Sequence, residues 1–263
     1  MERAERLKAV ASAQALELVG VTRSFGALMA VAGVDLTVAA GERRAVLGSN
    51  GAGKTTLFNA VTGDFPPTAG RIRFFGEDVT TLPPFERIRR GLRRTYQNSL
   101  LFKGLSVEDN LYLAVRGVTR RRMSLLRPGD DHASRAAARR LAHAIPLDTV
   151  AARPVAELSH GQQRQLEIGM ALAGAPRFIL FDEPAAGLSP AERRDLVDIL
   201  KALPAHIGFI IIEHDLSVAL EVAETVTVMH MGRIFKEGLP HEIEDDPEVQ
   251  RIYLGSGLGG GHG

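Results

Sequence analysis

The chain has 263 residues, of which 45% are hydrophobic and 24% are charged, a composition typical of a folded protein with a substantial core. Its formal net charge of +1 provides no broad field for nucleic acid or an acidic membrane, so any basic patch must be local. There is no cysteine, which excludes disulfides and thiolate metal sites and is typical of a reducing compartment. The sequence contains neither a membrane-spanning apolar run of ~20 residues nor a secretory signal.

Strand and helix patterns alternate along the chain, which predicts an α/β fold. Residues 15–20, 33–38 and 71–79 alternate between apolar and polar and predict a small antiparallel sheet. Three short runs are continuously apolar, as expected of parallel strands buried on both faces: residues 43–47, 177–181 and 207–212. Residues 225–238 predict two strands with a turn at Met231-Gly232.

The segment from about Asn98 to Arg164 has helical patterns only, which predicts an all-helical insertion in an α/β core. The expected division of the chain is a flexible N-terminal extension at 1–14, a core at 15–97 and 166–240, a helical subdomain at 98–165, and a C-terminal helix and tail at 241–263. The last residues, GSGLGGGHG, bury nothing and are expected to be disordered.

The stretch GSNGAGKT, Gly48 to Thr55, matches the phosphate-binding P-loop pattern in full and lies between an apolar strand and a helical pattern. Glycines let backbone N–H groups turn inward around phosphates, and the helix that follows adds its positive end. Lys54 would reach the β- and γ-phosphates, and Thr55 would bind Mg²⁺. A chance glycine turn is the alternative, which the flanking strand and helix disfavour.

The sequence RFILFDEP places two carboxylates at the end of a buried strand. Asp182 is suited to hold Mg²⁺ through water, and Glu183 to orient or deprotonate an attacking water at the mouth of the sheet. A solvated acidic turn is the alternative, and the four apolar residues before it together with the upstream P-loop argue against it.

Two further residues are candidates for the same site. His214 follows a third buried strand in IIIEHD; a lone histidine is more often structural, but this one should open onto the nucleotide. Gln97, in RRTYQ, lies where the helical insertion begins and could bond to a phosphate oxygen or to water on Mg²⁺.

A second anion site is predicted at LSHGQ, residues 158–162, where Ser159 and Gly161 begin a helix with free N–H groups. With the other motifs in this order, the chain resembles the ATP-binding-cassette family of P-loop NTPases from about Leu16 to Leu254. The resemblance implies that LSHGQ is the family's signature, LSGGQ, which caps the γ-phosphate at a partner's P-loop in a head-to-tail dimer. His160 replaces the commoner glycine and is expected to point away from the phosphate.

The resemblance implies a complete set of site residues and the cofactors ATP and Mg²⁺. The nucleotide-binding residues would be Phe25, Gly48, Ser49, Asn50, Gly51, Ala52, Gly53, Lys54, Thr55 and Thr56; the signature Ser159, His160, Gly161 and Gln162; the catalytic residues Glu183, His214 and Gln97; and the metal ligands Thr55, Gln97 and Asp182. Phe25 would stack on adenine, unless it is a core residue of the small sheet.

The loop after the carboxylates, Gly187-Leu188-Ser189, matches the family segment in which many members have aspartate. Serine is expected to weaken that contact across the dimer, although it creates a helix start with Pro190 and with Glu192 as part of a capping box.

Several longer stretches resemble the ATPase subunits of bacterial importers for branched-chain and related amino acids, amides or urea. These stretches are RRTYQ, SHGQQRQLEIGMAL, DEPAAGLSP, IIEHDLSV and EVQRIYLG; residues 116–135 also resemble an extended segment of one of two sister ATPases. The resemblance implies a second ATPase subunit, identical or a sister, two membrane permease subunits, and indirectly an extracytoplasmic solute-binding protein. It places the chain at the cytoplasmic face of the inner membrane, with no nucleic-acid partner and with the solute left open.

The arginine-rich run at residues 86–94 lacks the aromatic residues of a nucleic-acid surface, which leaves a solvated face or a docking rim for the membrane subunits. Two other functions are alternatives to transport. A soluble ABC ATPase acting on DNA or ribosomes would need long coiled coils or a second cassette, and neither is found in the 263 residues. A small-molecule kinase would leave LSHGQ unexplained.

Overall fold

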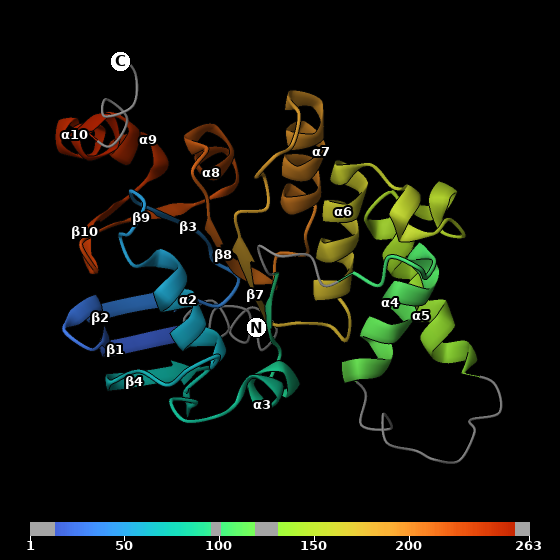
Figure 1. The fold of residues 1–263 in the computed structure, drawn as a ribbon, viewed down its shortest axis with the longest axis horizontal. Coiled ribbons are helices and arrows are strands. Elements are labelled where there is room, and N and C mark those ends of the chain that lie inside the picture. Colours follow the sequence, from blue (N-terminus) through green and yellow to red (C-terminus); the bar gives the residue numbers. More distant parts are fainter. Residues whose placement is uncertain (1–13, 96–100, 119–130, 256–263) are drawn as a thin grey trace, which may run out of the picture.

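A six-stranded sheet forms the centre of the computed structural model, which describes residues 14–95, 101–118 and 131–255 (Figure 1). Its strands, in spatial order, are β10 (Arg233–Gly238), β9 (Thr225–His230), β3 (Arg43–Leu47), β8 (Gly208–Ile212), β7 (Phe178–Asp182) and β6 (Leu92–Arg94). All are parallel except β10, which pairs with β9 across the turn at Met231-Gly232. The predicted mixed, mainly parallel sheet and the predicted turn are confirmed; the short strand β6 was not predicted.

The continuously apolar strands are buried on both faces, as the sequence predicts. Every residue of β7 and of β8 is buried, and side chains alternate between two apolar clusters because successive residues of a strand point to opposite faces. Ile210 and Ile212 join the cluster around helix α2 (Lys54–Thr62), whereas Phe209 and Ile211 join the cluster on the other face.

A second, antiparallel sheet covers α2. Its spatial order is β2 (Leu28–Ala39), β1 (Gln14–Phe25), β4 (Ala69–Phe74) and β5 (Glu77–Asp78). Residues of β1, β2, β4 and α2 share one apolar cluster with the central sheet, so α2 is packed between the two sheets. The short helix α3 (Pro84–Arg89) then leads into β6.

Helices cover the opposite face of the central sheet. They are α6 (His160–Ala171) at its C-terminal end, α7 (Pro190–Lys201), α8 (Leu216–Val222), α9 (Pro240–Glu244) and α10 (Pro247–Gly255). With the antiparallel sheet and α2 on one side, this gives the layered α/β architecture that the alternating sequence pattern predicts.

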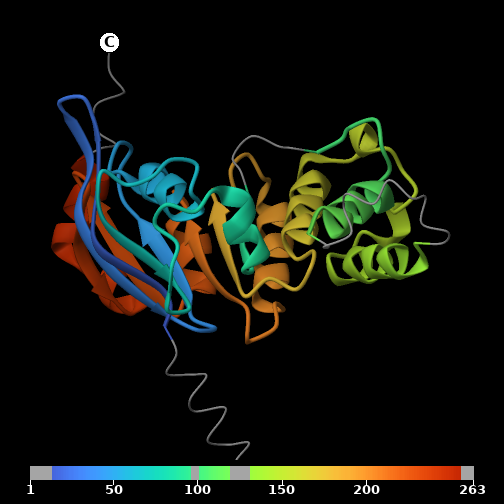
Figure 2. The same cartoon turned by 90° about the horizontal axis from the view of Figure 1, so that it is seen from below.

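Helices joined by turns make up the segment between β6 and β7 where the structure describes it, and no strand of either sheet lies there. It contains α4 (Val107–Val118), α5 (His132–Ala144), two single 3₁₀ turns at Asp148–Val150 and Val155–Glu157, and α6. These elements share their own apolar cluster, which includes Leu111, Ala138 and Ile145, and they form a lobe beside the sheets (Figure 2). Helix α6 runs through the expected boundary at 165/166 and joins this lobe to the core, since Leu166 belongs to the helical cluster and Ile168 to the core cluster.

Four of the predicted features lie partly or wholly outside the described residues: most of the N-terminal extension, Gln97, most of the segment 116–135 and the glycine-rich tail. Among the described residues, no helix is long and apolar enough to cross a membrane.

The interpretation of residues 86–94 as a solvated face is wrong for part of the run. Arg87 is 1% exposed and Arg93 is also buried, whereas Arg89 is exposed. Arg93 donates to the carbonyls of Ile88 and Ala173 and thereby joins β6 to the end of the α6 segment.

Arg87 holds the C-terminal end of the P-loop helix. Its guanidinium donates to the carbonyl oxygens of Val61 (2.6 Å), Ala60 (2.8 Å), Leu82 (2.9 Å) and Thr80 (3.0 Å). The last carbonyls of a helix lack partners within the helix and carry partial negative charge, so a buried cation is stabilised there. Burial nevertheless lowers the pKa of Arg87 to about 10.

Replacing Arg87 by methionine should destabilise the fold strongly. Arg87→Met keeps the apolar stem but removes the donor to four carbonyls, two of them in buried hydrogen bonds, and we expect a loss of about 3 kcal/mol or more in the free energy of unfolding, measured with urea. The control is Arg89→Met in the same helix, which is exposed and should cost less than about 1 kcal/mol. Equal effects of the two substitutions would contradict this role.

Candidate nucleotide site

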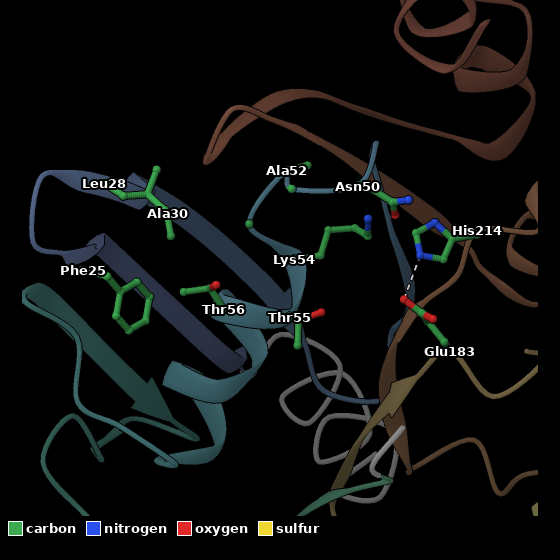
Figure 3. Close-up of a pocket in the computed structure, with 12 residues that line it drawn as sticks. Phe25, Leu28, Ala30, Asn50, Ala52, Lys54, Thr55, Thr56, Glu183 and His214 are labelled. Atoms are coloured by element: carbon green, nitrogen blue, oxygen red, sulfur yellow. Dashed lines mark hydrogen bonds and ion pairs between the residues drawn. The ribbon is translucent and has the colours of Figure 1, made fainter. Parts of the chain in front are cut away.

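One pocket gathers most of the residues that the motifs single out. It has a volume of about 350 Å³, and Figure 3 shows its two ends: Phe25 near the tip of the β1–β2 hairpin, and Glu183 with His214 beyond the P-loop. The described residues that line it are Phe25, Leu28, Ala30, Asn50, Gly51, Ala52, Gly53, Lys54, Thr55, Thr56, Glu183 and His214. Leu28 and Ala30 are the additions that the sequence did not predict.

The P-loop backbone requires its glycines. A Cβ on Gly53 would lie 2.3 Å from the carbonyl oxygen of Ala30, and one on Gly48 would lie 2.3 Å from that of Met229, so neither position accepts a side chain. Gly53 also has a φ of 98°, in the left-handed region that favours glycine. Because Gly53 is the N-cap of α2 and no side chain caps this helix, its first N–H groups are available to an anion.

Lys54 points back over the P-loop. Its ammonium is nearly buried and donates to the carbonyl oxygens of Gly48 (2.7 Å) and Ser49 (3.1 Å). Burial lowers the pKa of Lys54, and the nearby carboxylates of Glu183 and Asp182 oppose that shift. The amine is therefore held on backbone acceptors at the place where it would meet phosphate oxygens.

Glu183 and His214 form a pair at the carboxyl ends of β7 and β8. Oε1 of Glu183 lies 2.7 Å from Nε2 of His214 (Figure 3). Glu183 has a φ of 50°, an unusual conformation for a non-glycine residue, and its N–H donates to the carbonyl of Ile212 on β8. Backbone strain of this kind is common at functional sites, and here it turns the carboxylate into the pocket.

Asp182, the expected metal carboxylate, is buried in an ion pair. Its Oδ2 lies 2.6 Å from Nη2 of Arg94, and the same guanidinium also binds Asp64 at 2.9 Å. Arg94 was grouped with the solvated run; its side chain is instead 5% exposed, so that expectation is wrong here too. The pairing arises because Arg94 ends β6 opposite Leu180, two residues before Asp182 at the end of β7.

The residues present fit Mg²⁺ bound together with phosphate. No group of three or more His, Asp or Glu that could hold a metal ion occurs in the described parts of the chain. Mg²⁺ commonly uses one or two carboxylates plus phosphate oxygens and water, so a single carboxylate, Asp182, and the Thr55 hydroxyl are a suitable protein contribution. Gln97, the third expected ligand, lies outside the described residues.

Phe25 is not a core residue. It is 45% exposed, lines the pocket and contacts Phe65 edge to face at 5.6 Å, with the Arg23 guanidinium 4.7 Å from its ring centre. The alternative interpretation, a core phenylalanine of the small sheet, is therefore wrong. An exposed aromatic ring beside the P-loop is well suited to stack on a planar base.

The signature lies elsewhere in the chain. Ser159 caps α6 in a capping box with Gln162, and both line a different pocket together with Asp195 and Asp198 of α7. His160 is exposed, and its Cε1 would be 3.3 Å from a Cβ on Gly187. The described structure therefore does not bring the signature to the P-loop within one chain.

Glu213 is a buried carboxyl that the sequence analysis did not single out. It is 3% exposed, and it accepts hydrogen bonds from the N–H of Ala185 (2.7 Å) and of His214 (3.2 Å). Burial raises its pKa to about 7, and the charge of Glu183 adds to that rise. Its signal in the sequence was its place between the apolar strand β8 and His214. It ties the loop after Glu183 to the backbone that carries His214.

Glu213 should make the stability of the fold depend on pH. Between the ordinary glutamate pKa of 4.5 and the folded value of about 7, the folded chain keeps a proton that the unfolded chain has lost. The contribution of Glu213 to the free energy of unfolding is therefore fully present below about pH 4.5 and is lost as the pH rises through about 7. Glu213→Gln mimics the protonated acid, so its stability relative to wild type should rise between about pH 5 and pH 8, by up to about 3 kcal/mol.

Urea unfolding of both proteins at the two pH values measures this change. Glu244→Gln, an exposed glutamate on α9, is the control and should show no such gain. A Glu213→Gln variant whose stability relative to wild type is the same at both pH values would show that folding does not raise the pKa of this carboxyl.

Comparisons with known proteins agree with the geometry of the pocket. The family described as "ABC transporter" matches residues 31–186, more than half of the chain. The high-affinity branched-chain amino acid transport ATP-binding protein BraF of Pseudomonas aeruginosa is 38% identical over 248 residues, which cover 91% of this chain and 97% of BraF. The protein of the same description, LivG, from Escherichia coli is 34% identical over 248 residues, with 91% and 97% coverage.

Solved structures show the same relationship. The ADP conformation of MJ1267, an ATP-binding cassette of an ABC transporter, superposes with a TM-score of 0.82 at 31% identity and covers 92% of this chain and 99% of MJ1267. The P-loop, the two carboxylates at the end of β7 and the histidine after β8 are thus arranged on the fold of an ATP-binding cassette. The chain belongs to the ABC transporter family and is one of its ATPases.

Proposed function

We propose that this chain is the ATP-hydrolysing subunit of an importer for branched-chain amino acids or a related amino acid, amide or urea solute. The observation that carries the catalytic part is the pocket that joins the P-loop to the Glu183–His214 pair. The solute class is supported by the names of BraF and LivG, which match over nearly their whole length. The chain would be peripheral, at the cytoplasmic face of the inner membrane, bound to permease subunits. These subunits would receive the solute on the other side of the membrane from an extracytoplasmic binding protein.

In this proposal the pocket holds ATP along its length. Adenine stacks on Phe25, and the phosphates lie on the N–H groups of residues 48–56 with Lys54 exchanging its carbonyl partners for phosphate oxygens. Mg²⁺, held by Thr55, Asp182 and Gln97, supplies charge neutralisation at the phosphates when it is bound.

Glu183 then prepares the water that attacks the γ-phosphate. Its carboxylate faces the pocket, and its partner His214 fixes the orientation of the oxygen that does not bind the water. Glu213 holds both residues from behind through the backbone N–H groups of Ala185 and His214. These contacts hold in one place the Glu183 oxygen that would accept the proton from water.

The signature completes the pocket of a second chain. Because Ser159 and Gly161 lie away from the P-loop of their own chain, a γ-phosphate can reach them only when another ATPase subunit, identical or a sister, packs head to tail. ATP would then form part of the interface between the two ATPase subunits, and its hydrolysis would let them separate. Closing and opening of this dimer would drive the permeases.

A groove of about 210 Å³ is the proposed docking place for a permease subunit. Its lining includes the apolar side chains of Leu101, Ala114, Val118 and Met170, with Arg93 and Arg94 of β6. It lies between the helical lobe and β6, whose last residue, Arg94, is bonded to Asp182, so a push on the lobe would reach the site. Copurification of permease subunits with the tagged chain from membranes tests this part; association with ribosomes or DNA instead would favour the soluble ABC ATPase.

Glu183→Gln should keep ATP binding but slow ATP hydrolysis by about 10²-fold or more, because the amide cannot take a proton from water. It should also trap an ATP-bound dimer, and membrane vesicles with the permeases should lose uptake of labelled leucine. Lys54→Ala is the comparison: it removes a charge from the phosphates and should weaken ATP binding itself. Hydrolysis by Glu183→Gln at the wild-type rate would rule out this assignment.

Mixing two inactive variants tests the shared site. Ser159→Arg blocks the signature and Lys54→Ala disables the P-loop, so each homodimer has one defective half in every site. In the mixed dimer, the P-loop of the Ser159→Arg chain meets the intact signature of the other chain. ATPase activity should return to at most about half of wild type if the two sites work independently.

The natural pair consists either of two copies of this chain or of this chain and a sister subunit. The experiment should therefore be repeated with a sister ATPase subunit, with one of the two substitutions in each chain. Wild-type activity per chain should rise steeply with protein concentration, because the site forms on association. Mixed dimers that form in both formats without any activity would mean that both sites must fire together or that the signature serves its own chain.

A further inference from the structure

The anion site at the start of α6 already holds a carboxylate from the same chain. The N–H of Gly161 donates to Oε1 of Glu192 at 2.9 Å, and the Ser159 hydroxyl lies 3.4 Å from the same oxygen. Ser159 and Gly161 are the groups expected to hold the partner's γ-phosphate. Glu192 therefore occupies the position that this phosphate needs.

The other oxygen of Glu192 serves its own helix. Oε2 accepts from the N–H of Ser189 at 3.0 Å and from its hydroxyl at 2.8 Å, which completes the capping box of α7. One carboxylate thus bridges the positive ends of two helices. Hydrogen bonds from Ser189 and then from Gly161 lower the pKa of Glu192, as expected for a charged acceptor.

The contact is close enough to require glycine at position 161. A Cβ there would lie 2.5 Å from Oε1 and 2.6 Å from Cγ of Glu192. The His160 ring also lies near the loop before α7, since a Cβ on Gly187 would be 3.3 Å from its Cε1. The signature and the loop 187–189 are therefore linked to each other before any partner arrives.

We propose that Glu192 is a positioning residue that occupies the signature until the partner's γ-phosphate displaces it, while it continues to cap α7. The inference rests on the proposed function, because it requires a phosphate to reach Ser159 and Gly161. Carboxylate and phosphate are both anions and compete for the same N–H group, so the carboxylate has to move. Oε1 then leaves Gly161 while Oε2 keeps its bonds to Ser189, so the arrival of ATP breaks the link between the start of α6 and the loop that follows Glu183.

The competition predicts the ATP concentration needed for dimerisation. Glu192→Gln keeps an acceptor for the α7 capping box but loses the charge that binds the Gly161 N–H most strongly. In a Glu183→Gln background, which removes turnover, half-maximal dimerisation should occur at an ATP concentration about fivefold lower, measured by light scattering.

Two control variants separate the loss of the Gly161–Glu192 bond from the general effects of removing a negative charge or destabilising α7. Asp195→Asn removes the same charge from an exposed position on α7 that also lines the signature pocket, and it should lower the ATP requirement much less than Glu192→Gln because the Gly161 N–H is bonded to Glu192. Ser189→Ala weakens the capping box but leaves the Gly161–Glu192 bond, so it should lower the melting temperature without lowering the ATP requirement.

An unchanged ATP requirement for Glu192→Gln, or an equal fall for Asp195→Asn, would overturn the role of Glu192. If the Glu183→Gln chain does not dimerise with ATP, alone or with a sister subunit, the shared site itself fails. The two failures are therefore distinguishable in one titration.

Discussion

The parallel register of β3, β8 and β7 is the constraint on which the rest of the site depends. Val46 lies opposite Ile212, and Ile212 lies opposite Asp182, so the three strands end level with one another. The P-loop, the Glu183 turn and the His214 turn therefore leave the sheet at one edge, although they are far apart in sequence. A shift of one residue in any of these strands would turn its side chains to the opposite face and dismantle the pocket.

Charged groups around this edge are held by partners from the same chain. Lys54 binds carbonyls of the P-loop, Asp182 binds Arg94, and Glu183 binds His214. At the signature, the Glu192 carboxylate accepts a hydrogen bond from the N–H of Gly161. In the proposed function, binding of ATP exchanges some of these partners: phosphate oxygens would replace the carbonyl acceptors of Lys54 and the Glu192 carboxylate that accepts from Gly161. A buried charge without a partner would be costly, which explains why Lys54, Asp182 and Glu183 each have a hydrogen-bond or ion-pair partner within the chain.

The sequence predicted the parts of the site that are local motifs. The P-loop, the strand-end carboxylates, the helix start at Ser159 and the α/β layering follow from spacing and apolar periodicity. What it did not predict are side-chain contacts between distant segments. Arg94 and Arg87 look like surface arginines because their carboxylate and carbonyl partners come from other elements. Glu192 was predicted as a cap for its own helix, and only the packing of α7 beside α6 shows that it also reaches Gly161.

The central claim is that the signature of one chain completes the pocket of another. The chain has no cysteine, so Asn50→Cys and Gln162→Cys would introduce its only thiols, one in each half of the composite site. A short thiol-specific cross-linker, applied to this double variant in a Glu183→Gln background, should give a product of two chains with ATP and not with ADP. A product with the mass of one chain, or no ATP-dependent product either alone or with a sister subunit carrying matching cysteines, would contradict the account.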